Sequence, residues 1–155
     1  MGQVNPFFMA LIWSEKFETG IESIDRQHEK LFATVNELEN LINTKTIDGP
    51  EIDKLISFLT EYVSMHFSHE EFCMDLARCP AAAQNKKAHE DFLRFFSAFK
   101  GDLAVSSPAN RNALLIQLQQ TLEKWLDGHI CKIDVQLRKL RQPMVNQGAP
   151  NVSLN

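Results

Sequence analysis

The sequence predicts an all-α protein, an up-down-up-down antiparallel four-helix bundle preceded by an N-terminal arm. Three observations favour this fold class. Apolar residues recur at the 3-4 spacing of one helical face in four long segments of the 155-residue chain. Short polar connections separate the segments, so neighbours in sequence are expected to be antiparallel neighbours in space. Neither a strand-like alternation nor an internal repeat competes with this interpretation.

One bundle domain is therefore expected over residues 1–142. Within it, residues 1–20 form the arm, because the apolar run from Pro6 to Trp13 can pack against the helices. Beyond Pro143 the composition turns to Asn, Gly, Pro, Ser and Gln, which predicts a flexible tail over residues 143–155.

The first helix is expected over residues 21–43. Its apolar positions follow in steps of three and four, and His28 falls on the same stripe. Thr19, followed three residues later by Glu22, predicts a capping box at the start of the helix. The polar segment 43–49 then ends it.

The second helix is expected to begin at Pro50, because proline suits a first helical turn, with Asp48 or Gly49 as the cap. It should stop before Pro80, since proline lacks a backbone donor and disfavours helix in the residue before it. The expected inward positions are Ile52, Leu55, Ile56, Leu59, Tyr62, Val63, His66, Phe67, Glu70, Cys73 and Met74.

The third helix is expected to end near Gly101, and the run Ser106-Ser107-Pro108 predicts a serine cap for a fourth helix that continues to Leu140. The expected inward positions of the third helix are Asn85, Ala88, His89, Phe92, Leu93, Phe96 and Phe99. Those of the fourth are Leu115, Leu118, Leu122, Trp125, Leu126, His129, Ile130, Ile133, Leu137 and Leu140.

Composition and charge argue against several kinds of partner. The formal net charge is -4 and no block of Lys and Arg occurs, so neither a nucleic acid nor an anionic membrane is expected as a partner. No stretch approaches the ~20 apolar residues of a membrane span, so no membrane insertion is expected. Cys73, Cys79 and Cys131 form no CxxC motif, which favours a reducing, cytoplasmic location.

Polar side chains gather on the faces that should form the core. Each helix carries one inward histidine: His28, His66, His89 and His129. A single histidine on an apolar face is usually a hydrogen-bonded core residue. Here, however, Glu70 shares a helical face with His66, and Asp134 follows His129. Burying four imidazoles with two carboxylates would be costly without a cation that uses their lone pairs.

The donor types narrow the choice of metal. Imidazole with carboxylate suits iron, manganese or zinc. Two carboxylates able to bridge favour a two-metal site over a single closed structural zinc. Asp134 is the weakest member by spacing alone, since five residues of regular α-helix turn it roughly 140° away from His129.

Several interrupted motifs follow one another between Trp13 and Leu140. They are Trp13-Ser14-Glu15, the run from Thr19 to His28, His66-Phe67 with Glu70-Glu71 and Met74, His89 with Phe92-Leu93, and Trp125-Leu126 with His129-Ile130 and Asp134. In this order they resemble the bacterial hemerythrin family. The resemblance implies a four-helix bundle with two non-heme irons, bridged by carboxylates and an oxo or hydroxo group, that reversibly binds dioxygen.

Carried over by position, the resemblance implies six iron ligands and an oxygen pocket. The ligands would be His28, His66, Glu70, His89, His129 and Asp134. Of these, the first two histidines would hold the iron that dioxygen reaches, the other two histidines would hold the second iron, and the carboxylates would bridge the irons. The apolar pocket that limits the access of water would be lined by Phe67, Trp125, Leu126 and Ile130.

The sequence departs from the family on the third helix. The family usually carries two histidines four residues apart, whereas this chain has Asn85 and then His89, with Cys79-Pro80 where the family has an aromatic-proline pair. Asparagine offers iron only a neutral carbonyl oxygen. Asn85 or a water could complete the second iron, that iron could bind weakly, the gap could make it reactive, or Asn85 could only satisfy a hydrogen bond. Our hypothesis is that a two-iron site forms, less firmly than with the full ligand set.

The resemblance favours a dioxygen-binding protein for storage, delivery or sensing. No general acid, base or nucleophile motif accompanies the ligands, which favours binding over enzymatic turnover. The alternative is a di-iron oxidase, peroxidase or nitric-oxide-handling enzyme that exploits the incomplete ligand set at Asn85. A sensory module, whose output would need a separate protein partner, ranks third, and a purely structural bundle ranks last.

Overall fold

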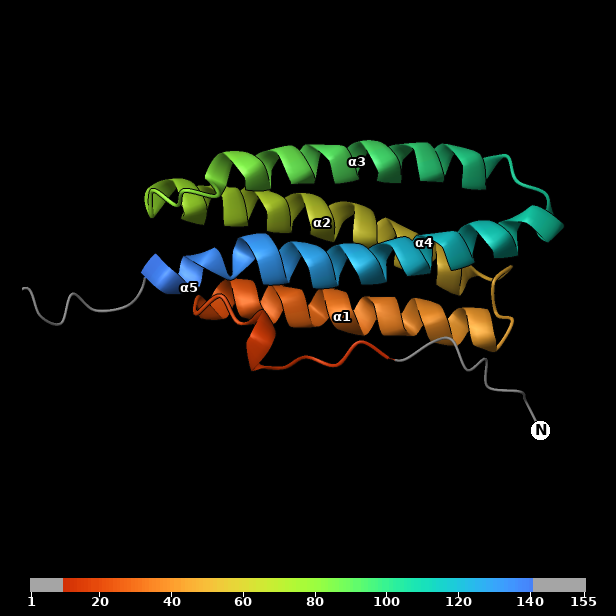
Figure 1. Ribbon diagram of the computed structural model, residues 1–155. Helices are drawn as coiled ribbons and strands as arrows, with labels where there is room; N and C mark the ends of the chain where they lie inside the picture. Colours follow the sequence, from red (N-terminus) through yellow and green to blue (C-terminus); the bar gives the residue numbers. More distant parts are fainter. Residues whose placement is uncertain (1–9, 141–155) are drawn as a thin grey trace, which may run out of the picture.

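The computed structural model describes residues 10–140, so the predicted tail over 143–155 and the first nine residues of the arm lie outside the described part. The four long helices are α1 (Glu22–Asn43), α2 (Pro50–Leu76), α3 (Ala82–Ala104) and α4 (Pro108–His129). In Figure 1 they lie side by side with connections at alternate ends. Both α1 and α3 contact α2 and α4, which closes the bundle. The predicted antiparallel four-helix bundle is confirmed.

The start of α1 differs from the predicted capping box. The cap position is Ile21, two residues after Thr19, and no side chain caps the helix there. Instead Asp25, one turn into the helix, accepts hydrogen bonds through Oδ1 from the Thr19 backbone N–H at 2.7 Å and the Thr19 hydroxyl at 2.8 Å. Gly20 permits the approach because its φ of 78° lies in the left-handed region. The capping-box prediction was therefore wrong, because a second carboxylate competes for the same threonine.

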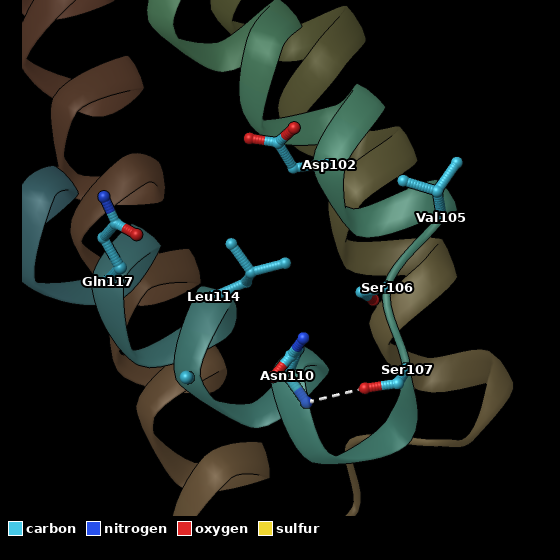
Figure 2. Close-up of a pocket in the computed structure, with 8 residues that line it drawn as sticks. Asp102, Val105, Ser106, Ser107, Asn110, Leu114 and Gln117 are labelled. Carbon is cyan, nitrogen blue, oxygen red and sulfur yellow. Dashed lines mark hydrogen bonds between the residues drawn. The ribbon is translucent and has the colours of Figure 1, made fainter.

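The other predicted helix starts are confirmed. Gly49 precedes Pro50, which occupies the first turn of α2. At α4, the Ser107 hydroxyl accepts a hydrogen bond from the Asn110 backbone N–H, as Figure 2 shows. This bond satisfies one of the amide groups that a helix N-terminus leaves without a partner.

The predicted inward stripes form the core, with a few exceptions. Leu93 is 37% exposed, because the neighbouring Phe92 takes the inward direction and one residue turns the helix by about 100°. Leu140 is 42% exposed at the end of the last helix. Four more predicted positions are partly buried and pack against the margin of the core: Tyr62, Cys73, Ala88 and Trp125. The inward prediction was therefore wrong for Leu93 and Leu140.

The predicted fourth helix is interrupted. A π-helical turn occupies Ile130–Asp134, and a short helix, α5 (Gln136–Leu140), continues along the same line (Figure 1). A π-turn carries one residue more than an α-turn and so changes the register of the residues that follow it. The prediction of one regular helix from the serine cap to Leu140 was therefore wrong.

The described part of the arm packs against the bundle. Phe17, on a 3-10 turn (Glu15–Phe17), lies with its ring centroid 4.8 Å from that of Phe32, and Trp13 lies 5.4 Å from the same ring. From α5, Arg138 donates hydrogen bonds to the backbone carbonyls of Glu15 and Glu18. The two ends of the described chain are thus joined. Among residues 10–140, no helix is both long enough and apolar enough to span a membrane.

Candidate metal centre

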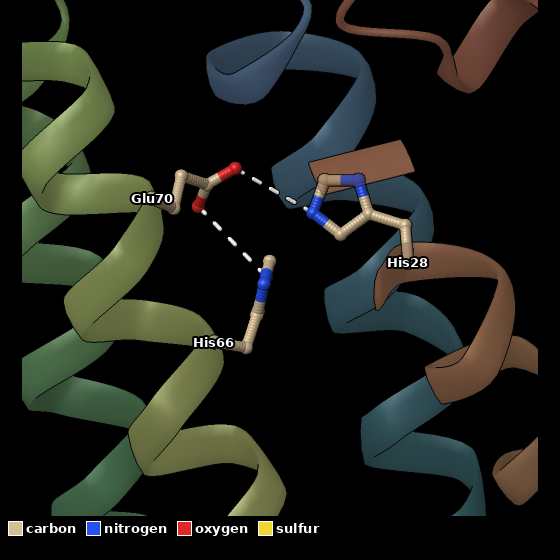
Figure 3. Close-up of side chains that lie close together, drawn as sticks. All are labelled: His28, His66 and Glu70. Atoms are coloured by element: carbon tan, nitrogen blue, oxygen red, sulfur yellow. Dashed lines mark ion pairs between the residues drawn. The ribbon is translucent and has the colours of Figure 1, made fainter. Parts of the chain in front are cut away.

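Three of the predicted ligands meet between α1 and α2. Figure 3 shows the His28 and His66 imidazoles and the Glu70 carboxylate pointing toward one another. His28 Nε2 lies 3.5 Å from Glu70 Oε1, and His66 Nε2 lies 4.0 Å from Glu70 Oε2. All three side chains are buried. Their potential ligand atoms lie within 4.8 Å of one another, a spacing that one cation can bridge.

A second group shares the same carboxylate. Glu70 groups with His89 from α3 and His129 from α4, again with potential ligand atoms within 4.8 Å of one another. His89 Nε2 lies 3.2 Å from Glu70 Oε2, and the ring centroids of His89 and His129 are 5.0 Å apart. Glu70 therefore stands between two pairs of histidines, one pair on each side.

Asp134 stands between the same two pairs. Its Oδ2 lies 3.5 Å from His28 Nε2, and its Oδ1 lies 3.1 Å from His129 Nε2. The π-turn explains this placement, because hydrogen bonds between residues five apart, such as the one from the Val135 backbone N–H to the Ile130 carbonyl at 3.1 Å, bring positions five apart close to one face. The expectation from regular helix geometry, that Asp134 turns roughly 140° away from His129, was therefore wrong.

The atoms at the centre have no hydrogen-bond partners of their own. Among the buried side-chain atoms without a partner are both nitrogens of His28, Nε2 of His89 and His129, Oε1 of Glu70 and both carboxylate oxygens of Asp134. Leaving a buried polar atom without a partner costs about 1–3 kcal/mol. Imidazole nitrogens and carboxylate oxygens are good ligands for divalent cations. The donor set therefore fits the two-metal group that the sequence predicted.

The ionisation of the cluster matches this use. Burial lowers the pKa of His66 to about 3 and that of His129 to about 4, so both imidazoles are neutral near pH 7, the form that ligates metals. Burial and the Glu70 charge raise the pKa of Asp134 well above its ordinary range. Burial alone would also raise the pKa of Glu70, but the imidazoles of His28, His89 and His66 hold it below its ordinary value. A cation would stabilise both groups as carboxylates.

Two residues that sequence reasoning did not single out orient the imidazoles. Gln27 Oε1 lies 2.9 Å from His66 Nδ1 and 3.1 Å from His69 Nδ1. Glu71 Oε1 lies 2.9 Å from His89 Nδ1. An acceptor on Nδ1 places the proton there and leaves Nε2 free to ligate. Gln27 and Glu71 each directly neighbour a predicted ligand in sequence. The imidazole that each one contacts lies on another helix, so the spacing along one helix could not reveal the contact.

Asn85 lies inside the cluster. It is fully buried, and its amide Nδ2 donates to Glu70 Oε2 over a long 3.4 Å, while its Oδ1 has no hydrogen-bond partner. This contact agrees with the alternative that Asn85 satisfies a hydrogen bond, here to Glu70. It leaves His89 and His129 as the two imidazoles of the group on this side.

The four predicted pocket residues belong to the main apolar core or pack against it, and two of them contact imidazoles of the cluster. Phe67, Leu126 and Ile130 are buried in the main apolar core, and Trp125 packs against it. The Phe67 ring stacks on the His89 imidazole at 3.7 Å, and the Trp125 ring stacks on His129 at 4.1 Å. The two aromatic rings therefore cover the imidazoles on the Asn85 side of the centre.

Of two surface pockets, one touches the candidate centre and the other is separate from it. One, of about 290 Å³, is lined in part by Lys124, Trp125, His129 and Lys132, and so touches a predicted ligand. The other, of about 390 Å³, lies at the α3–α4 connection (Figure 2). Asp102 is the one ionisable residue among those that line it, and this residue stands 13 positions, or about 20 Å of helix, from His89. The second pocket is therefore separate from the centre.

The comparison with known proteins agrees with this arrangement. A family model described as Hemerythrin HHE cation binding domain matches residues 19–140. The chain belongs to the hemerythrin family. It is accordingly a cation-binding hemerythrin-family protein with buried clusters of histidine and glutamate.

Named relatives cover most of this hemerythrin-family chain. It is 30% identical over 128 residues to a bacteriohemerythrin of Methylococcus capsulatus, a match that covers 81% of this chain and 93% of the relative. It is 29% identical over 120 residues to a bacteriohemerythrin of Pseudomonas aeruginosa, over 77% of this chain and 74% of the relative. A myohemerythrin of Theromyzon tessulatum is 26% identical over 118 residues, which cover 76% and 82% of the two chains. The sequence resemblance to this family is thus confirmed.

Proposed function

We propose that this protein holds two iron ions and binds dioxygen reversibly, as a carrier, store or sensor rather than an enzyme. The observation that supports the proposal most directly is the pair of histidine groups that share Glu70 at the centre of a buried, apolar bundle. Membership of the hemerythrin family points to the same chemistry.

In this proposal each side chain has a distinct role. His28 and His66 would hold the iron that dioxygen reaches, and His89 and His129 would hold the second iron. Glu70 and Asp134 would each supply a carboxylate to both irons. Iron supplies the electrons that a dioxygen ligand needs for reversible binding.

The surrounding residues favour binding over turnover. Phe67, Leu126 and Ile130 are at most 3% exposed and carry no group that can deliver a proton. The Phe67 ring centroid lies 5.7 Å from that of His66, so Phe67 borders the half that dioxygen would reach, whereas Trp125 stacks on His129. An apolar wall excludes water and protons from the site, so these residues would preserve reversible binding.

Asn85 weakens the second half of the centre in this proposal. Its carbonyl Oδ1 is free to face a cation, but an amide oxygen is a poorer iron ligand than imidazole. Two histidines therefore hold each iron, one fewer on the Asn85 side than in a three-histidine site, and this side also adjoins the surface pocket that His129 lines. We expect this iron to bind second and to leave first.

The test is optical. The iron-loaded, reduced protein is mixed with dioxygen in a stopped-flow instrument and then returned to vacuum. A binding protein gives an absorption band that forms on mixing and disappears on deoxygenation over repeated cycles. A single irreversible conversion to the oxidised form, with no recoverable band, would refute reversible binding.

One observation favours a second candidate, an oxidase, peroxidase or nitric-oxide-handling enzyme. The pocket of about 290 Å³ touches His129, so the side of the centre that Asn85 leaves short of a histidine also adjoins the surface. Continuous dioxygen consumption with an external reductant, at many turnovers per chain, would support the enzyme. Consumption of one dioxygen per site, independent of reductant, would support the binding protein.

A further inference from the structure

One histidine of the chain lies outside the candidate metal centre. His69 stands on α2 three residues after His66, which turns it about 60° away from that side chain, and it is half-buried at the surface. Its Nδ1 lies 3.1 Å from Gln27 Oε1, the same oxygen that lies 2.9 Å from His66 Nδ1. A single amide oxygen on α1 therefore joins a surface histidine to a predicted metal ligand.

This amide oxygen fixes where the two imidazoles carry their protons. A carbonyl oxygen only accepts hydrogen bonds, and its two lone pairs suffice for two donors. Both imidazoles must then donate from Nδ1, and His69 can do so whether it is neutral or charged. In neutral His66, a proton on Nδ1 leaves Nε2 without one, which is the form in which that nitrogen can bind a metal.

The opposite tautomer of His66 also has an attraction in the structure. His66 Nε2 lies 4.0 Å from Glu70 Oε2, and a carboxylate favours a proton on the nitrogen that faces it. If the Gln27 amide turned over, its NH₂ group would face His66 Nδ1, and the proton of the imidazole would move to Nε2. A proton on Nε2 blocks ligation. The direction of one amide thus selects between a metal-binding and a non-binding His66.

Three side chains of α2 hold that amide in place. His66 and His69 donate to its oxygen, and its Nε2 lies 3.7 Å from Met65 Sδ, a weak acceptor. With His69 in place, turning the amide over requires both imidazoles to give up the proton on Nδ1 at once. Without His69, only His66 must change. His69 therefore adds to the free-energy cost of the non-binding arrangement.

We infer that His69 is a positioning residue for the half of the centre to which His66 belongs. It holds the oxygen of Gln27 toward His66, and through that amide it keeps Nε2 of His66 free of a proton. The inference rests on the proposed function, because it takes His66 as a metal ligand. The tautomer of His66, however, is a property of the metal-free chain and can be measured without iron.

The test is the tautomer of His66 in the metal-free protein at pH 7, obtained by NMR from the nitrogen chemical shifts of isotope-labelled histidine. The natural chain is expected to carry the proton on Nδ1. His69→Leu removes the donor and should give a mixture with the Nε2–H form. His69→Asn, whose side-chain NH₂ can donate from nearly the same place as Nδ1, should restore the natural shifts. Ser68→Leu is the matched control and should leave His66 unchanged, because the exposed Ser68 hydroxyl donates to the Ser64 carbonyl of its own helix.

A titration with ferrous iron under argon gives a second readout. His69→Leu should weaken the tighter binding step about three-fold, less than the 10–100-fold loss typical of a group that contacts the ligand directly, and should spare the weaker step. His69→Asn should recover the natural affinity.

Three results would overturn the inference: a natural chain with the His66 proton on Nε2, a His69→Leu variant with unaltered His66 shifts, or a His69→Asn variant that behaves as His69→Leu does. A natural chain that binds no iron would instead contradict the proposed function, and the nitrogen shifts would still decide the role of His69.

Discussion

Removing the Glu71 carboxylate should loosen one half of the metal centre and spare the other. Glu71 Oε1 lies 2.9 Å from His89 Nδ1 and so sets the tautomer and direction of that imidazole. Loss of such an acceptor typically weakens metal binding about 10–100-fold. Since 28% of the Glu71 side chain is exposed, water can replace part of the contact in Glu71→Ala. We therefore expect the lower end, about ten-fold, or about 1.4 kcal/mol.

The assay is a calorimetric titration of metal-free protein with ferrous iron under argon. Two binding steps are expected, and Glu71→Ala should weaken the weaker step, which we assign to the Asn85 side. Glu71→Gln keeps an acceptor oxygen of nearly the same shape and should lose less affinity. Gln27→Ala removes the acceptor of His66 and should instead weaken the tighter step. Equal losses in both steps for both alanine variants would refute the assignment of one acceptor to each half.

Three further predictions follow from the geometry. Asn85→His should raise the occupancy of the second iron, measured as iron per chain after desalting; unchanged occupancy would remove Asn85 as the cause of weak binding. In the metal-free protein, the histidines of the unfolded chain bind protons below about pH 6.5. In the folded chain, His129 stays neutral down to about pH 4 and His66 down to about pH 3. Stability in urea should therefore fall as pH drops from 6.5 to 4, by up to about 1.4 kcal/mol per pH unit for each histidine; a flat profile would contradict their burial as neutral groups. Deleting Lys132 turns the π-turn into an α-turn, in which Asp134 still faces His129, so iron binding should survive. Inserting an alanine after Lys132 instead turns Asp134 away from His129 and should abolish the weaker binding step.

The bundle and its inward histidines could be predicted because both depend on local periodicity. A stripe repeating every three or four residues sets the direction of every side chain on a regular helix, so one histidine per helix on such a stripe implies convergence. The same logic located His28, His66 and His89, all buried at the centre of the structure.

What could not be predicted depends on departures from regular helix or on contacts between helices. Asp134 reaches the centre through a π-turn, whose one extra residue is not revealed by the periodicity of a regular α-helix. Thr19 pairs with Asp25 rather than with Glu22, the partner that the capping box predicted. Spacing alone does not reveal which of the two carboxylates binds the threonine. Gln27 and Glu71 act on imidazoles of other helices, so only the folded chain brings them into contact.

The proposal of two irons is tested most directly by counting them. Protein reconstituted with excess ferrous iron under argon and then desalted is analysed for iron per chain, with its absorption spectrum recorded under air and again under vacuum. The proposal predicts two irons per chain and a band that appears in air and disappears under vacuum. One iron per chain at saturation, or a spectrum that vacuum does not alter, would contradict it.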